Sequence, residues 1–383
     1  MKTRLGIGVI GAGGRGWLSA LAHQPRKGIR IVAACDTVSA TLAAYRDKYG
    51  QDIFCTHDYR ELLKRDDVGA VFVCSPDFLH EEHALAALKA GKAVYLEKPM
   101  TITLAGCDRV LRTATKLKGK LYLGHNMRHF TFVQKMRKLI HDGAIGEVKA
   151  AWCRHFISYG GDAYFKDWHA DRTKSTGLLL QKAAHDIDVL HWLCGGYTDR
   201  VVAQGALTLY DKIKDRHPAS ERGDASWSMD NWPPLSLKGM NPVMDVEDVS
   251  HVLMHLDNGV LATYQQCHFT PDAWRNYTII GTHGRIENIG EDTVALWNKR
   301  SYYKEKGDRQ FKAPYASGSH GGADPRIVNE FLRYVLEDIP TLTSPIAARN
   351  SVATGYLATQ SLRANSKPLA IPPVDPAVLA YFA

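Results

Sequence analysis

The residues best suited to chemistry begin with a glycine-rich segment near the start of the chain. Residues 11–16, GAGGRG, have the spacing G-x-G-x-x-G; they follow an apolar run at residues 5–10 and precede a segment of helical spacing. Asp36 lies twenty residues beyond Gly16, at the end of a second apolar run. In this context the pattern is typical of a dinucleotide-binding loop, whose unpaired backbone N–H groups face the phosphates.

The spacing of the glycines explains how such a loop works. The first glycine lets the chain turn tightly, the second lets the backbone approach the pyrophosphate, and the third lets strand and helix pack closely. Asp36 is expected to accept hydrogen bonds from the adenosine ribose and to repel a 2′-phosphate, which favours NAD over NADP. The cofactor-binding residues predicted from this segment are Gly11, Gly13, Gly14, Arg15, Gly16 and Asp36.

The elements that must position this loop lie in the first third of the chain. Alternation of short apolar runs with segments of helical spacing predicts right-handed strand–helix–strand crossovers and a parallel sheet covered on both faces. Residues 1–124 are therefore predicted to form a doubly wound, Rossmann-type α/β domain. The expected strands are residues 5–10, 29–35, 70–74, 93–96 and 121–123.

Beyond residue 124 the pattern changes to longer, alternating strands with few helices between them. Residues 125–383 are predicted to form an α+β domain for substrate binding and oligomerisation, with a large open, mostly antiparallel sheet and closing helices that can pack back on the first domain. Asp257-Asn258-Gly259 predicts a hairpin. The expected strands are residues 148–155, 201–209, 249–256 and 260–267, followed by a second hairpin at residues 277–287; residues 211–243 form a long excursion.

The composition is that of an ordinary globular protein. With 383 residues, 45% hydrophobic and 23% charged, two domains are the natural expectation, and no run approaches the roughly eighteen apolar residues of a membrane span. The net charge of +8 is dispersed, without the basic stripe of a nucleic-acid-binding protein.

The seven cysteines form no CxxC pair and the 17 histidines are scattered, so no disulfide framework or metal site is predicted. Thiol cysteines and an N-terminus without a signal-peptide core predict a cytoplasmic protein.

Three further motifs make the prediction more specific. Residues 73–80, VCSPDFLH, end the third long strand; residues 97–99, EKP, end the next; and residues 185–188, HDID, follow a Gly-Leu-Leu-Leu run. In this order, behind the glycine loop, they resemble the Gfo/Idh/MocA oxidoreductase superfamily, which includes glucose–fructose oxidoreductase and inositol dehydrogenase. The resemblance covers essentially the whole chain. It implies an NAD-dependent enzyme that transfers hydride to or from a hydroxyl or ketone of a sugar or polyol, assembled as a homo-oligomer, dimer or tetramer, through the C-terminal sheet.

Lys98 is the first expected catalytic residue. Hydride transfer from a hydroxyl-bearing carbon needs a base within hydrogen-bond reach of the hydroxyl proton. Lys98 follows a parallel strand, at the edge where open α/β sheets bind ligands, and in the resembled family the matching lysine contacts the reacting hydroxyl. Glu97 is expected to orient this lysine or the carboxamide region, beside a proline, Pro99, that is often cis in the family.

His185 is the second expected catalytic residue. In the resembled family the matching histidine of H-x-x-D exchanges a proton or holds the substrate hydroxyl, and the ordinary pKa of histidine suits proton exchange near neutrality. Asp188, three residues on, shares the helix face and either orients the imidazole or pairs within the helix.

The resemblance implies further contacts around these two residues. Ser75, Pro76 and His80, together with Glu97 and Lys98, are expected to lie on the nicotinamide side. Aromatic faces suit the C–H side of sugars, so a cluster of Tyr164, Trp168, His169 and Arg172 is considered beside the substrate. The substrate-binding residues expected in all are Arg128, Trp168, Gln181, Lys182, His185 and Asp188.

Position 181 departs from the commonest pattern of the resembled family. Many of its sugar dehydrogenases carry an Asp four residues before the histidine, whereas this chain has Gln181 followed by Lys182. Glutamine cannot act as a base, although it can hydrogen-bond a sugar hydroxyl, and Lys182 can pair with an anionic group of the substrate. Two net reactions therefore remain: NAD-dependent oxidation or reduction, and a redox-neutral glycoside cleavage or epimerisation through a transient 3-keto sugar. A non-catalytic NAD-sensing protein is disfavoured by Lys98 and His185.

Overall fold

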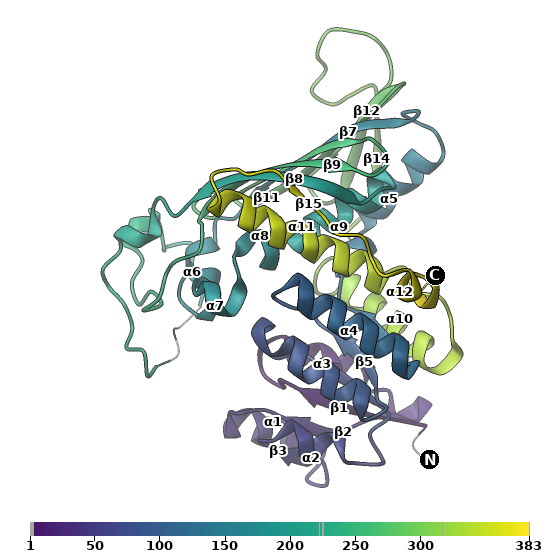
Figure 1. The fold of residues 1–383 in the computed structure, drawn as a ribbon, viewed down its shortest axis with the longest axis vertical. Coiled ribbons are helices and arrows are strands. Elements are labelled where there is room, and N and C mark those ends of the chain that lie inside the picture. The colour runs from purple at the N-terminus through teal and green to yellow at the C-terminus, as the bar shows by residue number, and fades with distance from the viewer. Residues whose placement is uncertain (1–3, 222, 224–225, 316, 383) are drawn as a thin grey trace. The chain divides into compact units, whose positions relative to one another are not determined.

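The computed structural model describes residues 4–221, 223, 226–315 and 317–382. The chain divides into two compact units, each with its own sheet (Figure 1). Unit 1 comprises residues 1–129, 317–349 and 374–383, and unit 2 comprises residues 130–316 and 350–373. The last fifth of the chain therefore contributes helices to unit 1 as well as to unit 2.

Unit 1 is built on a six-stranded sheet whose paired strands are all parallel. The strand order is β3-β2-β1-β4-β5-β6, so the direction of strand addition reverses between β1 and β4. This is the strand order of a Rossmann fold, in which the reversal creates the crevice that binds dinucleotides, and it confirms the predicted doubly wound sheet. The strands are β1 Leu5–Ile10, β2 Ile29–Cys35, β3 Phe54–Thr56, β4 Ala70–Val73, β5 Ala93–Leu96 and β6 Leu121–Leu123.

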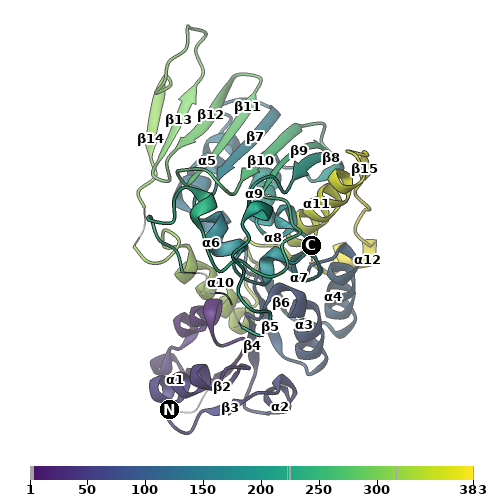
Figure 2. The same cartoon turned by 90° about the vertical axis from the view of Figure 1, so that its left-hand side faces the viewer.

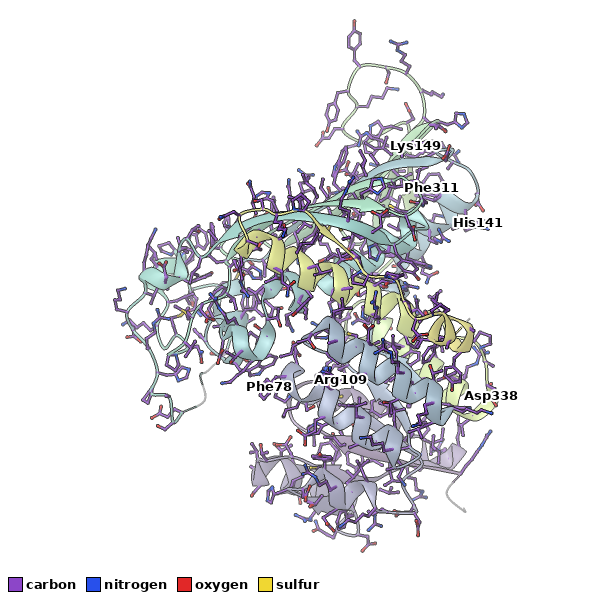
Figure 3. The ribbon with its side chains drawn as sticks, in the orientation of Figure 1. Phe78, Arg109, His141, Lys149, Phe311 and Asp338 are labelled. Carbon is purple, nitrogen blue, oxygen red and sulfur yellow. The ribbon has the colours of Figure 1, made fainter. Side chains whose placement is uncertain are left out.

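Helices cover this sheet on both faces. One face packs against helices η1, α1 and α10 in a core cluster that includes Leu18, Tyr45 and Phe331. Helices α3 and α4 pack against each other, and Glu81 on α3 forms an ion pair with Arg109 on α4, with a nitrogen–oxygen distance of 2.5 Å. Arg109 is labelled in Figure 3. The helices of the unit are η1 Gly14–Ala22, α1 Ser39–Tyr49, α2 Tyr59–Leu63, α3 His80–Lys89, α4 Leu104–Leu117, α10 Ala323–Glu337 and α12 Pro376–Phe382.

The helix expected after the glycine loop is a 3-10 helix, η1. The hydroxyl of Ser19 donates to the carbonyl oxygen of Gly16 at 2.8 Å, and the hydroxyl of Tyr45 donates to the same oxygen at 3.1 Å. In an α-helix the N–H of Ala20 would use this acceptor. Because side chains compete for it, the segment keeps the tighter turn.

Unit 2 is built on a nine-stranded sheet of order β14-β13-β12-β11-β7-β10-β9-β8-β15, which Figure 2 shows edge to edge. Strands β7 and β10 run parallel, and the other described pairs are antiparallel. The predicted open, mostly antiparallel sheet is confirmed. Its strands are β7 Val148–Phe156, β8 Thr198–Ala206, β9 Val249–Leu256, β10 Leu261–Cys267, β11 Trp274–Gly281, β12 Gly284–Ile289, β13 Thr293–Trp297, β14 Arg309–Lys312 and β15 Leu369–Ala370; Lys149 on β7 and Phe311 on β14 are labelled in Figure 3.

Both predicted hairpins are present, at β9–β10 and at β11–β12. Strand β8 begins and ends three residues earlier than the predicted 201–209. The reason is Asp248, whose carboxylate accepts the backbone N–H groups of Thr208, Leu209 and Tyr210 and draws the chain out of the sheet.

The helices of unit 2 include one that lies directly on the sheet. Helix α9 Ala183–Cys194 packs against β7, β10 and β11, and its side chains are buried apart from His185 and Trp192.

In the part of the chain that the structure describes, no helix has the length and apolar character needed to cross a membrane. The other helices are α5 Thr131–His141, α6 Gly160–Tyr164, α7 Arg172–Ser175, α8 Leu178–Gln181 and α11 Pro345–Arg363, which continues across the division at residue 349.

Candidate functional site

The glycine loop of unit 1 follows β1, and β4 is the neighbour of β1 across the reversal in strand order. Gly11 has a φ of +81°, and a Cβ atom there would lie 2.6 Å from the backbone nitrogen of Ser75. A Cβ atom on Gly16 would lie 2.2 Å from the carbonyl oxygen of Gly11. Neither position has room for a side chain, so the loop is held against the end of β4.

The middle glycine of the loop could carry a Cβ atom without a clash inside the protein. A Cβ atom on Gly13 would meet only ordinary contacts, the nearest at 3.5 Å from Oδ2 of Asp36. The N–H of Gly13 donates to Asp36 Oδ2 at 2.9 Å, and the N–H of Val38 donates to Oδ1 at 2.9 Å. We call the loop surface at Gly13 the cradle, and the Asp36 carboxylate held beside it by two backbone N–H groups its rim. Such a surface fits the pyrophosphate and ribose of a dinucleotide.

Arg15 ties this loop to two other parts of unit 1. Its Nε donates to Glu97 Oε1 at 2.9 Å, and its two Nη atoms donate to the carboxylate of Asp324 at 2.9 and 2.7 Å. Burial alone would raise the pKa of Asp324, but hydrogen bonds from His320 and Arg15 lower it well below the ordinary range. The guanidinium expected to contact the cofactor therefore links the residue that follows β5 to the first turn of α10.

Lys98 directly follows Glu97, one of the two carboxylate residues bound by Arg15. The Glu97 carboxylate is buried, and its Oε2 accepts the N–H of Lys98 at 3.1 Å; the peptide bond between Lys98 and Pro99 is cis. The ring nitrogens of His80 lie 2.7 Å from the carbonyl oxygen of Pro99 and 2.8 Å from that of Ser75. His80 thus joins the segments that follow β4 and β5, and the structure brings this part of the predicted cofactor site together in unit 1.

Arg128, expected to contact substrate, lies in the 3-10 helix Asn126–His129 of unit 1. It is buried, and one of its Nη atoms donates to the carbonyl oxygen of Leu342 at 2.8 Å.

In unit 2, α9 is held to the sheet by a residue that sequence reasoning missed. Asp186, next to His185, is fully buried, and its carboxylate lies 2.7 Å from Nε of Arg275. It also accepts hydrogen bonds from His155 Nδ1 at 3.0 Å, from the Tyr264 hydroxyl at 3.1 Å and from the Tyr277 hydroxyl. These partners come from β7, β10 and β11, so the network fixes the turn of helix that carries His185.

The protonation states of this network follow from burial and charge. Burial, with the nearby Arg275 guanidinium, lowers the pKa of His155 to about 3, so this imidazole is neutral and donates through Nδ1. Burial alone would raise the pKa of Asp186, but Arg275 and His155 lower it well below the ordinary range. The carboxylate and the guanidinium therefore balance each other's charge.

The remaining predicted substrate residues of unit 2 lie on α8, α9 and the segment before them. Lys182 joins α8 to α9, and its Nζ lies 3.2 Å from the hydroxyl of Tyr159 and over the rings of Tyr159 and Tyr164. The Trp168 ring stacks on His169, which meets Tyr164 edge-on. Arg172 of the expected aromatic cluster instead pairs with Asp245 on the exposed surface. Gln181 and Asp188 are buried.

Two further residues that sequence reasoning missed are Tyr159 and His268. They follow the carboxyl ends of the parallel neighbours β7 and β10, where ligands of parallel sheets gather, and this position could have identified them from the sequence. Among the described residues, no group of three or more His, Cys, Asp or Glu side chains is placed to hold a metal ion.

Two models of one protein family match the chain. The model described as the NAD-binding Rossmann fold of an oxidoreductase family matches residues 5–125, and the model described as its C-terminal alpha/beta domain matches residues 137–371. The protein YteT of Bacillus subtilis is 26% identical over 367 residues, which cover 82% of this chain and 84% of that protein. A myo-inositol 2-dehydrogenase of Thermotoga maritima is 25% identical over 359 residues, which cover 93% and 96%.

A solved structure has the same fold. Levoglucosan dehydrogenase in complex with NADH and L-sorbose aligns with a TM-score of 0.78 at 19% sequence identity, over 97% of this chain and 100% of that chain.

The glycine loop allows cofactor binding and folding to be separated by two matched variants. We expect Gly13→Ala to change the free energy of unfolding by less than about 1 kcal/mol, because its Cβ fits the protein, and to weaken dinucleotide binding by about tenfold or more, because the Cβ occupies the open cradle. Gly16→Ala, which must displace the Gly11 carbonyl, is expected to lose about 2 kcal/mol of stability. Urea unfolding and fluorescence titration with NADH measure the two effects. Unchanged NADH affinity in Gly13→Ala would show that the pyrophosphate binds elsewhere.

Proposed function

The chain belongs to the Gfo/Idh/MocA oxidoreductase family, as the sequence motifs predicted, and on that premise we propose that it transfers hydride between a nicotinamide and a hydroxyl or ketone carbon of a sugar or polyol. The substrate class is supported by a relative that is a myo-inositol dehydrogenase. The observation that carries the proposal is the link from the glycine loop to Lys98: Arg15 of the loop donates to Glu97, the residue before Lys98. A dinucleotide held by the loop would lie beside a lysine at the carboxyl end of β5.

The proposed roles follow from the chemistry that hydride transfer requires. A bound NAD supplies the hydride acceptor. We assign to Lys98 the removal of the substrate hydroxyl proton, and to His185 proton exchange with, or a hydrogen bond to, a substrate hydroxyl. Glu97 acts as a positioning residue through the N–H of Lys98 and through Arg15. The proposed substrate contacts are Arg128, Trp168, Gln181, Lys182 and Asp188.

The function is tested with the full chain, NAD at saturation and a broad panel of sugars and polyols, following both NADH absorbance and product formation. We expect at least one substrate to be converted, and Lys98→Met to lower kcat by about 100-fold or more, the usual scale of a lost general base. NADH affinity should stay within about threefold of the unaltered protein, because the glycine loop is untouched. His185→Gln is expected to act in the same way.

The matched control is Lys89→Met, which removes an exposed lysine of α3 and should leave kcat unchanged. Net NADH formation supports the dehydrogenase reaction, whereas conversion of substrate without net NADH supports the redox-neutral alternative. If no member of the panel is converted in either way, the proposed function is wrong.

We further propose NAD, rather than NADP, as the cofactor, because the Asp36 carboxylate is fixed at the rim of the cradle by two backbone N–H groups. A negative charge there repels a 2′-phosphate. Asp36→Asn keeps an acceptor but removes the charge, so the ratio of NADP to NAD dissociation constants should fall by about tenfold, the effect of about 1.4 kcal/mol. Asp47→Asn, an exposed position of α1, is the control. An unchanged ratio in Asp36→Asn would remove this basis for NAD preference.

We also propose that the enzyme is a homo-oligomer that associates through the sheet of unit 2, in the cytoplasm, where its seven free cysteines would stay reduced. The supporting observation is an exposed apolar group on neighbouring strands: Trp152, Leu253 and Leu261 are 37%, 61% and 61% exposed. Thr263 of β10 is paired with both Leu253 and Trp152, so the three side chains lie close on one face of the sheet. Exposed apolar groups of this kind mark association surfaces.

Sedimentation measures this assembly directly. We expect a dimer or tetramer, and we expect the double variant Leu253→Glu, Leu261→Glu to be monomeric, because charges cannot be buried unpaired in an interface. Leu379→Glu, at an exposed leucine of α12, should keep the assembly. A monomeric unaltered protein would contradict the proposal.

A further inference from the structure

Lys182 is a buried lysine of unit 2 whose partners are phenols. It is 9% exposed, its Nζ lies 3.2 Å from the Tyr159 hydroxyl, and it sits 5.4 Å from the ring centres of both Tyr159 and Tyr164. Among the described residues, no carboxylate lies within 4.0 Å of this ammonium group. Buried cations are ordinarily paired with an anion, because leaving water is costly for an isolated charge.

The other charged groups near Lys182 do not balance it. Asp186 is the buried carboxylate of the neighbouring network, and Arg275 already pairs with it at 2.7 Å. His155 and His268 are neutral, because burial lowers the pKa of His155 to about 3 and holds the pKa of His268 well below the ordinary value. None of these groups therefore forms an ion pair with the Lys182 ammonium.

Lys182 keeps that charge at neutral pH. Burial disfavours the ammonium form, but the phenols of Tyr164 and Tyr159 outweigh this cost and raise the pKa of Lys182. In return, the Lys182 ammonium lowers the pKa of Tyr159. The Arg275 guanidinium adds to this effect, and together the two cations outweigh burial, which raises the pKa. A phenol beside a cation is a stronger hydrogen-bond donor to an incoming anion.

A second, independent observation points to a ligand at the same place. His268 is fully buried, and neither of its ring nitrogens has a hydrogen-bond partner among the described residues. Its ring meets Tyr164 edge-on, with ring centres 5.5 Å apart, and it lies within electrostatic reach of Lys182. Buried polar groups are almost always hydrogen-bonded in native proteins, so an imidazole with a free donor and a free acceptor fits a polar ligand.

The backbone explains why these groups converge. Strands β7 and β10 are parallel neighbours, with Phe156 paired to Cys267, so Tyr159 and His268 emerge from the same edge of the sheet. A Cβ atom on Gly160 would lie 2.2 Å from the carbonyl oxygen of His268, which shows how closely the two segments pack. Lys182 is the N-cap of α9, and the N-terminal end of this helix carries a partial positive charge.

We propose that Lys182, Tyr159 and His268 bind a carboxylate of the substrate, and that the enzyme therefore acts on an acidic sugar such as a uronic acid. This deepens, and rests on, the proposed function, because it names the substrate class. Lys182 forms the ion pair, and the Tyr159 hydroxyl and an N–H of His268 donate to the carboxylate oxygens. Lys182 is the N-cap of α9 and His185 is the third residue of that helix, so both lie at its N-terminal end.

The single charge of Lys182 favours a carboxylate over a phosphate. One lysine neutralises one negative charge, whereas a phosphate dianion is ordinarily held by arginine forks or several N–H donors together. The guanidinium of Arg275, which acts electrostatically on Lys182 and Tyr159, already pairs with Asp186 at 2.7 Å.

The test uses matched sugars that differ only at C6: D-glucuronate against D-glucose, and D-galacturonate against D-galactose, with D-glucose 6-phosphate as a third arm. Binding to the NAD-loaded full chain is measured by calorimetry. We expect at least one uronate to bind about tenfold or more tightly than its neutral counterpart. Lys182→Met should remove that preference, by weakening uronate binding about tenfold or more beyond any weakening of neutral-sugar binding.

Two further variants keep the test decisive if Lys182→Met does not fold. Lys182→Arg retains the charge and should keep part of the preference, and Tyr159→Phe should reduce it by removing one donor. Lys174→Met is the matched control, because Lys174 is a lysine of the same unit that already has a carboxylate partner, Asp171, at 3.5 Å. It should leave the uronate preference unchanged.

Three outcomes overturn the proposal: both uronates bind no more tightly than their neutral counterparts, Lys182→Met weakens uronate and neutral sugar equally, or glucose 6-phosphate alone binds in a Lys182-dependent way. Calorimetry needs no turnover, so the two proposals fail separately. Lys182-dependent uronate binding without conversion of any sugar would leave the carboxylate site standing and remove the hydride-transfer function.

Discussion

Unit 2 depends on the compensation of one buried charge, the carboxylate of Asp186. A carboxylate without solvent must be paired and fully hydrogen-bonded, or its burial would cost several kcal/mol. The chain meets this requirement with Arg275, Tyr264 and Tyr277 and with a neutral imidazole, from three neighbouring strands. Because all of these partners converge on one residue of α9, the helix can take only one rotation on the sheet. That rotation sets where His185 and Lys182, which both precede Asp186 in the chain, are presented.

Unit 1 solves the same problem in the same way. Glu97 is buried directly before Lys98, as Asp186 is buried directly after His185, and its carboxylate is engaged by Arg15 and by the N–H of Lys98. In each unit, a residue proposed for catalysis is therefore the chain neighbour of a buried, internally satisfied carboxylate. Such a neighbour fixes the backbone at the residue proposed for catalysis. A fixed backbone is what a catalytic group needs, since small displacements are costly to the rate.

What could be predicted from the sequence is what depends on residues close together in the chain. Strand β9 occupies the predicted residues 249–256, and the doubly wound parallel sheet was predicted from a local pattern of glycines and apolar runs. The Asp186 network could not be predicted, because its partners stand 31 to 91 residues away. The 3-10 form of η1 has a similar origin, since the Tyr45 hydroxyl that takes the Gly16 carbonyl comes from another helix. The sequence shows the residue types at candidate positions. It does not show which of these side chains are already hydrogen-bonded or ion-paired within the protein.

The charge of Lys182 and the departure at position 181 belong to one electrostatic arrangement. In many sugar dehydrogenases that the chain resembles, an aspartate stands four residues before the histidine, and such a carboxylate would be the chain neighbour of Lys182. Gln181 is buried and neutral, so it leaves the positive charge of its neighbour in place. An aspartate there could accept a proton or balance Lys182 within the protein, whereas a glutamine does neither. The absent carboxylate and the lysine without a carboxylate partner therefore both support the proposed acidic sugar, which would bring its own negative charge.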